Sequence, residues 1–280
     1  MLAMALGLLL VSTFVTAPIL LLSGGTMSTP ALLVTQGITQ LLSFLLPVVL
    51  MTLIYYRGCQ REYYRLDFSG RKWYYALAGM VVMLLLVPVI DWLTAWNDAW
   101  NLGRVGELLR RLQEQTEGIV EQMMSASTVG GLLANLLVVA LIPAVCEEVF
   151  FRAGIQNLLQ RWLSADGRRP WGVHVAIWLT AIAFSLGHGE VFSFVPRLLM
   201  GALLGYLYVY SGSLLPNVAA HFINNALVVT LYWLSARGVI DIDPDEPLAV
   251  GEALTACCTL AAVGIFATTF LIKGRSSRSL

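Results

Sequence analysis

The stretch PAVCEEVFFRAG, residues 143–154, places three charged side chains inside an otherwise apolar segment. Each charge at the centre of a membrane helix costs roughly 2.5–3.5 kcal/mol, so such residues usually mark function. Glu148 and Arg152 are four residues apart, share one helix face and can form an ion pair. Glu147 points about 100° away and has no partner within its own helix. We therefore expect Glu147 to act as a base, while Glu148 and Arg152 either orient the site or form a structural ion pair.

The composition around this stretch is that of a membrane protein. Of the 280 residues, 58% are apolar and 12% are charged, whereas about a quarter of the residues in soluble domains are charged. Long uncharged apolar runs recur along the chain. No basic run interleaved with aromatic residues occurs, so nucleic acid is not an expected partner. These features predict an all-α fold, a polytopic transmembrane helical bundle.

We expect about eight membrane spans, interrupted by one long polar segment at residues 97–128. Within that segment, VGELLRRLQEQTEGIVEQMM has helical periodicity and mixed charge, which indicates a solvated or interfacial helix. Of the Lys and Arg residues in the connecting segments, eleven lie on one side of the membrane and four on the other, which predicts that both termini face the cytoplasm. The expected spans are 2–23, 31–56, 73–96, 129–162, 171–189, 191–210, 214–236 and 247–272.

Three polar residues in later spans can meet Glu147. His188 lies 17 residues after position 171 and Glu147 lies 16 residues before position 163, so in antiparallel helices both lie at similar depth. His221 and Asn225 are four residues apart and share one helix face. For peptide hydrolysis, Glu147 assisted by His188 would take a proton from water. His221 and Asn225 would donate hydrogen bonds to the developing oxyanion.

These residues fall into three short motifs, E-E-x-x-x-R, F-x-x-x-H and H-x-x-x-N, which follow one another between residues 140 and 230. The matching residues are Glu147, Glu148 and Arg152, then Phe184 and His188, then His221 and Asn225. With these motifs the chain resembles the CPBP family, which comprises type II CAAX prenyl endopeptidases and the bacteriocin-processing or immunity proteins called Abi. The resemblance implies an eight-helix, glutamate-type intramembrane endopeptidase. It also implies that the first Glu and first His activate water, while the last His and Asn hold the oxyanion.

The family has also been described as metal-dependent, and Glu and His are plausible Zn²⁺ ligands. We expect no metal cofactor, because the H-x-x-x-N pair lacks the second histidine of a zincin helix. Glu147 and His188 can also activate water without one. Zn²⁺ is the alternative.

The expected organisation has three parts. Residues 1–128 hold three N-terminal spans and the polar interfacial helix, residues 129–240 the CPBP/Abi-like catalytic core, and residues 241–280 the last span with a basic tail. The expected partners are the lipid bilayer and a membrane-associated peptide or protein substrate. The resemblance favours a bacterial inner (cytoplasmic) membrane.

Two other functions are open to such a chain. One is a non-catalytic membrane scaffold or bacteriocin-immunity-type protein, which would not need Glu147, His188, His221 and Asn225 together. The other is an ion-coupled transporter with Glu147 and His188 as a proton relay, which the lack of inverted repeats disfavours.

Overall fold

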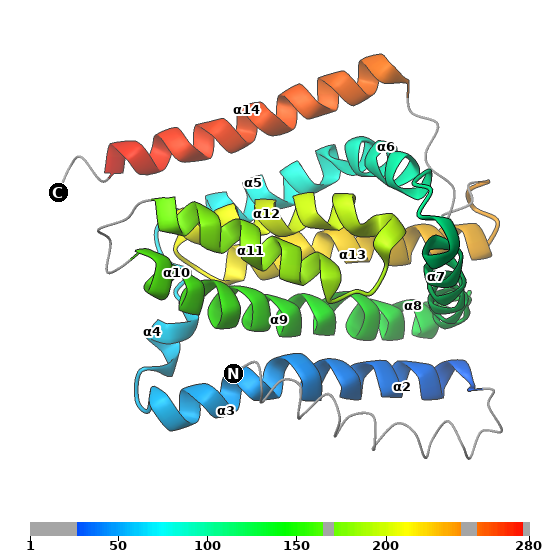
Figure 1. The fold of residues 1–280 in the computed structure, drawn as a ribbon, viewed down its shortest axis with the longest axis horizontal. Helices are drawn as coiled ribbons and strands as arrows, with labels where there is room; N and C mark the ends of the chain where they lie inside the picture. Colours follow the sequence, from blue (N-terminus) through cyan, green and yellow to red (C-terminus); the bar gives the residue numbers. More distant parts are fainter. Residues whose placement is uncertain (1–26, 165–170, 242–250, 277–280) are drawn as a thin grey trace.

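The computed structural model describes residues 27–164, 171–241 and 251–276, and these residues form helices joined by short loops, with no strand among them (Figure 1). A helix satisfies its backbone N–H and C=O groups internally, which hydrocarbon surroundings require. The predicted all-α helical bundle is therefore confirmed, and the long apolar helices are those of an integral membrane protein.

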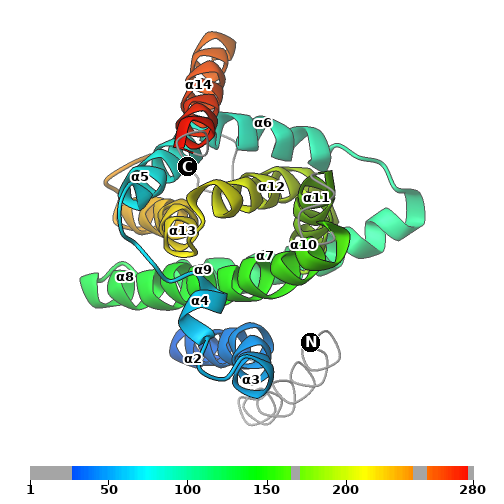
Figure 2. The same ribbon diagram turned by 90° about the vertical axis from the view of Figure 1, so that its left-hand side faces the viewer.

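Two long helices lie side by side along one face of the bundle (Figures 1 and 2). The first, Thr29–Tyr55, and the second, Val129–Ser164, each contain π-helical turns, which widen the helix locally and often occur at functional sites. Their parts are α2 (Thr29–Gln40), a π-turn (Leu41–Leu45) and α3 (Leu46–Tyr55), then α8 (Val129–Asn135), a π-turn (Leu136–Leu141), α9 (Ile142–Glu148), a π-turn (Val149–Gln156) and α10 (Asn157–Ser164).

The other helices cover the opposite side of α9 and close one end of the bundle. Between α3 and α8 the chain forms α4 (Gln60–Tyr64), α5 (Lys72–Leu85), α6 (Val87–Asp98) and α7 (Gly103–Met124). After α10 it forms α11 (Trp171–Leu186), a 3₁₀ turn (Val191–Ser193), α12 (Phe194–Ser211), α13 (Leu215–Ala236) and α14 (Glu252–Ser276). Helix α7 is the helix predicted within the polar segment 97–128.

The described residues contain four helices long and apolar enough to cross a membrane, or five if a bent pair counts as one span. The four are Thr29–Tyr55, Val129–Ser164, Val191–Ser211 and Leu215–Ala236. The pair is α5 and α6, bent by 48° at a break where Pro88 lies in the first turn of α6.

The expectation of about eight spans is therefore not confirmed. Helix α11 has 16 residues and ends at Leu186, short of the predicted end at residue 189. The described apolar part of α14, Leu254–Thr268, is also shorter than a full span. The predicted span 2–23 lies outside the described residues.

Helix α9 occupies the centre of the arrangement, in contact with α2 and α13, while the π-turn that follows it contacts α11. Small residues bring α11 and α12 close together. A Cβ atom at Gly205 would lie 2.8 Å from Cγ2 of Ile177, and one at Gly201 would lie 3.2 Å from Cα of Ala181. This close packing brings the end of α11 toward α9 and α13, where the predicted site residues meet.

Candidate active site

Glu147 is buried in α9, with only 5% of its surface exposed. The preceding Pro143 lies in the first turn of α9, where a missing N–H is tolerated. One carboxylate oxygen, Oε1, accepts a hydrogen bond of 3.0 Å from Nε2 of Gln40 on α2. The other, Oε2, has no hydrogen-bond partner among the described residues. Glu147 therefore presents one anchored oxygen and one buried oxygen that is free to bind.

Two histidines from different helices face this free oxygen. The Nε2 atom of His188, just beyond the end of α11, lies 3.9 Å from Oε2 of Glu147. The Nε2 atom of His221, on α13, lies at the same distance of 3.9 Å. These separations are too long for direct hydrogen bonds, but a water molecule at about 2.8 Å from each atom can bridge them. The structure thus brings together Glu147, His188 and His221 around a position suited to water.

A backbone hydrogen bond determines which ring nitrogen of His188 carries the proton and which one is left as an acceptor toward Glu147. Nδ1 lies 2.8 Å from the carbonyl oxygen of Phe184, one turn earlier. Because a carbonyl only accepts, Nδ1 carries the proton, and Nε2 of the neutral ring has a free lone pair. Gly189 follows with a φ of +72°, a left-handed conformation that suits glycine and turns the chain away after the histidine. His188 is therefore oriented to accept a proton.

Glu148 links three helical segments through its fully buried carboxylate. Its Oε2 accepts hydrogen bonds from Nε of Arg152 at 2.9 Å and from Nδ2 of Asn217 at 3.1 Å. Its Oε1 accepts one from Nδ1 of His221 at 3.1 Å. The ion pair with Arg152 expected from their spacing is present, and Glu148 also orients the histidine that faces Glu147. Both roles that the sequence left open are thus compatible with its contacts.

The charges of this cluster balance when His221 is doubly protonated. Arg152 and the imidazolium would then carry two positive charges, and Glu147 and Glu148 two negative ones. In this state Nε2 of His221 becomes a hydrogen-bond donor, since Nδ1 already donates to Glu148.

Asn225 lies one turn beyond His221 on α13 and is half-buried. Its Oδ1 accepts a hydrogen bond of 3.3 Å from Nδ2 of Asn224. No hydrogen bond among the described residues joins it to Glu147 or His188. The structure therefore brings together five of the six predicted site residues and leaves Asn225 beside them with its amide donor directed to none of them.

Two further site residues were missed in the sequence. Gln40 binds Glu147 from a helix more than 100 positions away, and only its polarity within an apolar span could have indicated a role. Asn217 binds Glu148 and also donates to the carbonyl of Leu204 at 2.6 Å. Its position four residues before His221 puts it on the same helix face, and this spacing was an available signal.

The loop after His188 is fastened by buried polar side chains of α6 and α7. Asn97, fully buried on α6, donates to the carbonyl of Val191 at 3.1 Å and accepts from the backbone N–H of Val195 at 2.7 Å. Gln113, on α7, accepts from the backbone N–H of Phe192 at 3.2 Å. Glu190, in the same loop, also pairs with Arg197 in the first turn of α12. The position of His188 thus depends on α6 and α7.

The side chains at the site do not converge as a metal centre requires. Among the described residues, no group of three or more His, Cys, Asp and Glu side chains stands in positions that could hold a metal ion. Two ligand atoms on a tetrahedral zinc ion, each at about 2.0–2.2 Å from it, lie about 3.4 Å apart. The distances of 3.9 Å from Oε2 of Glu147 to Nε2 of His188 and of His221 are longer than this.

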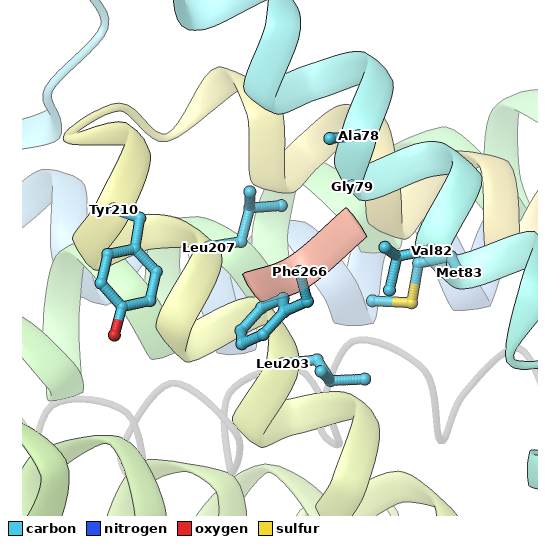
Figure 3. Close-up of a pocket in the computed structure, with 8 residues that line it drawn as sticks. All are labelled: Ala78, Gly79, Val82, Met83, Leu203, Leu207, Tyr210 and Phe266. Atoms are coloured by element: carbon cyan, nitrogen blue, oxygen red, sulfur yellow. The ribbon is translucent and has the colours of Figure 1, made fainter. Parts of the chain in front are cut away.

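A separate apolar crevice lies between α5, α12 and α14 (Figure 3). The close-up shows Met83 and Val82 of α5 facing Leu203 and Phe266, with Tyr210 at one side. None of the predicted site residues lines it, and the hydroxyl of Tyr210 is the one polar side-chain group among its lining residues. The crevice is therefore a packing gap between helices, distinct from the candidate active site.

Residues 129–227 match the family model described as type II CAAX prenyl endopeptidase Rce1-like. The matched segment contains all three motifs, and it confirms the family resemblance that they indicated. No curated protein and no solved structure gives a significant match.

Proposed function

We propose that the protein is an intramembrane endopeptidase that hydrolyses a peptide bond of a membrane-associated protein or peptide. One observation carries this proposal. The buried, unpartnered Oε2 of Glu147 lies 3.9 Å from Nε2 of both His188 and His221, which come from two other helices. The match of residues 129–227 to a family of membrane endopeptidases supports the same reaction class.

Water activation would use Glu147 and His188. A water molecule between Oε2 of Glu147 and Nε2 of His188 can donate a hydrogen bond to each, because both atoms are acceptors. Glu147 then takes a proton as the water oxygen forms a bond with the scissile carbonyl carbon. Gln40 holds the other carboxylate oxygen and so limits rotation of the base.

The carbonyl oxygen becomes an oxyanion in this step and needs donors. His221 would supply Nε2–H in its doubly protonated form, with Glu148 as the counter-ion at Nδ1. Asn225, one turn further along α13, would supply Nδ2–H. When the carbonyl re-forms, the C–N bond breaks, and the proton held by Glu147 passes to the leaving amine. Arg152 and Asn217 position Glu148 without touching the reacting atoms.

No step of this scheme passes through a metal ion. The donor positions around Glu147 disfavour a zinc site, and general-base activation of water by Glu147 and His188 needs no Lewis acid. We therefore propose a metal-independent reaction, with Zn²⁺ binding as the alternative that chelation tests.

A comparison of peptide termini in membranes tests the proposal. Membranes from cells producing the wild type, Glu147→Gln or His188→Gln at matched abundance would be analysed for new termini by mass spectrometry. Glu62→Gln, which changes an exposed carboxylate on α4, is the matched control.

Termini present with the wild type and the control, and absent with both site variants, would support the proposal and identify the substrate. If the wild type and both site variants give the same termini while a partner still binds all three, the non-catalytic scaffold replaces the protease.

A further inference from the structure

Helix α7 presents a row of large apolar side chains that no part of the described structure covers. Val105, Leu108, Leu112 and Ile119 are 65%, 60%, 51% and 47% exposed. Their spacings of three, four and seven residues put them on one face of the helix, here called the α7 stripe. Scattered exposed apolar residues are ordinary, whereas an aligned row of four indicates a binding surface.

The remaining surface of α7 divides into two further faces. Glu107, Glu114 and Glu121 are exposed and lie roughly opposite the stripe at about 100° per residue. Gly106, Gln113 and Met124 lie between these two faces and are buried against the rest of the protein. A helix with one protein face, one acidic face and one apolar face is suited to a boundary between water and an apolar phase.

The bundle places α7 at such a boundary. Figures 1 and 2 show α7 running across one end of the bundle, while α9 and α13 run along it. The middle of α7 reaches the loop after His188, where Oε1 of Gln113 accepts a hydrogen bond from the backbone N–H of Phe192. Near its C-terminal end, Gln122 donates to the carbonyl of Met27 at 2.7 Å, just before α2 begins. Helix α7 therefore lies across the point where membrane-crossing helices begin and end.

Tryptophan residues lie near both ends of α7. Trp96 and Trp100 pack edge to face 5.3 Å apart at the end of α6, immediately before α7. Trp233, near the end of α13, donates from Nε1 to the carbonyl of Thr128 just before α8. Trp is enriched where the hydrocarbon core meets the lipid headgroups. The exposed side chains of Arg104 and Arg111 flank the stripe, where cationic groups can reach lipid phosphates.

We propose that α7 lies in the plane of the membrane–water interface, with the α7 stripe inserted among the lipid acyl chains next to the headgroups. The occupant of the stripe is the bilayer itself, because α7 contacts the chain where two membrane-crossing segments begin and has Trp residues near both of its ends. The acidic face then points to water. Since Gln113 holds the backbone of Phe192, this docking also stabilises the loop 188–195 that follows His188.

Site-directed spin labelling of the full chain in liposomes tests the proposal. Cys59, Cys257 and Cys258 would be replaced by Ser, while the buried Cys146 is retained. Single labels would be placed on the stripe, at Leu108→Cys and Leu112→Cys, and on the acidic face, at Glu114→Cys and Glu121→Cys. Power saturation in liposomes of phosphatidylcholine and phosphatidylglycerol compares collisions with oxygen, which concentrates in lipid, and with a water-soluble nickel chelate.

Stripe labels should collide mainly with oxygen, at a depth of about 5–10 Å, and acidic-face labels mainly with the nickel chelate. Stripe labels that favour the nickel chelate would overturn the proposal, because the stripe would then be in water. Low collision rates with both reagents would overturn it too, because a protein or a second copy would then cover the stripe. The readout needs no peptide cleavage, so it stands independently of the proposed endopeptidase activity.

The effect on the loop has its own measurement. In the Leu108→Glu/Leu112→Glu variant in the same liposomes, backbone hydrogen exchange in residues 188–195 should be faster than in the wild type. The matched Glu107→Gln/Glu114→Gln variant, altered on the acidic face, should exchange like the wild type. Equal exchange in all three proteins would refute the part of the proposal that concerns the loop.

Discussion

Oε1 of Glu148 accepts a hydrogen bond of 3.1 Å from Nδ1 of His221, a residue 73 positions later in the sequence and on another helix. Through His221, this contact connects Glu148 with its neighbour Glu147. Glu148 fixes the ring whose other nitrogen lies 3.9 Å from Glu147. Arg152 compensates its charge in turn, so the buried carboxylate is both paired and fully hydrogen-bonded.

Replacing Glu148 with Gln should lower both stability and activity. Arg152 would be left buried without its counter-ion, which costs about 3–5 kcal/mol of unfolding free energy. His221 would lose the anion that favours its doubly protonated form, and we expect the cleavage rate to fall roughly 100-fold, as for loss of an oxyanion donor. Thermal unfolding in detergent and cleavage assays at saturating substrate measure the two effects.

The Glu148→Gln/Arg152→Gln double variant separates these effects. With no unpaired charge left, the double variant should regain much of the lost stability while its cleavage rate stays low. Recovery of both quantities together would mean that Glu148 serves only as a structural partner of Arg152.

Gln40→Leu should weaken the site through Glu147. The change leaves Oε1 of Glu147 buried without a donor, at a cost of about 1–3 kcal/mol. A base free to rotate should slow cleavage by roughly tenfold or more. Gln36→Leu makes the same chemical change one turn earlier on α2 and should leave the rate unchanged. Equal rates for both variants would show that Gln40 does not position the base.

The sequence is sufficient to predict contacts between residues of the same helix. Glu148 and Arg152 pair because their spacing places them on one helix face, whatever the fold around them. The similar depth of Glu147 and His188 followed from counting residues in antiparallel helices, and the structure places them 3.9 Å apart. The helical periodicity of the polar segment 97–128 likewise predicted helix α7. These inferences need only local geometry and one assumption about helix direction.

Contacts between helices were harder to predict. Whether Glu148 faces His221, or Gln40 faces Glu147, depends on how α9 is rotated against α13 and α2. The π-helical turns on both sides of α9 alter that rotation by amounts that no residue pattern reveals. The predicted number of spans is not confirmed for a related reason. Hydropathy does not show that α11 ends at Leu186 or that the chain bends by 48° between α5 and α6.

Asn225 is the site residue whose role most needs a test. If its Nδ2 stabilises the oxyanion, Asn225→Leu should lower the turnover rate by about 10²–10³ with little change in KM. Asn224→Leu is the companion variant, because it removes the donor to Oδ1 of Asn225 but leaves Nδ2 of Asn225 in place, so its turnover rate should stay near that of the wild type. A turnover rate equal to that of the wild type would remove Asn225 from the reaction and leave His221 as the donor.

Chelation should leave activity unchanged. The groups around Glu147 lack the convergence that zinc requires, so removal of divalent metal should not affect a base and a histidine that act directly on water. The purified protein would be treated with 1,10-phenanthroline or EDTA, its metal content measured, and cleavage followed before and after. Loss of cleavage that Zn²⁺ restores would instead establish the metal-dependent alternative.

The turn between α4 and α5 should make stability depend on pH in the acid range. Asp67 accepts hydrogen bonds from Lys72 and from the backbone N–H and hydroxyl of Ser69, and its carbonyl accepts from the hydroxyl of Ser213 at 2.7 Å. The bond from Lys72, followed by those from Ser69, lowers the pKa of Asp67 from 3.8 to about 2. Because the folded pKa lies below the unfolded one, the stabilisation is present above 3.8 and is lost as the pH falls toward 2.

Asp67→Asn should therefore unfold at a lower temperature than the wild type at about pH 6, and the difference should vanish near pH 2. Thermal unfolding in detergent across this range measures it, with Glu62→Gln as a control for loss of an exposed carboxylate outside the turn. A difference between Asp67→Asn and the wild type that is the same at both pH values would mean that the charge of Asp67 does not stabilise this turn. The hydrogen bonds from the Ser213 hydroxyl to the carbonyl of Asp67 and from the Leu214 N–H to the carbonyl of Arg65 would then suffice to hold the turn against the start of α13.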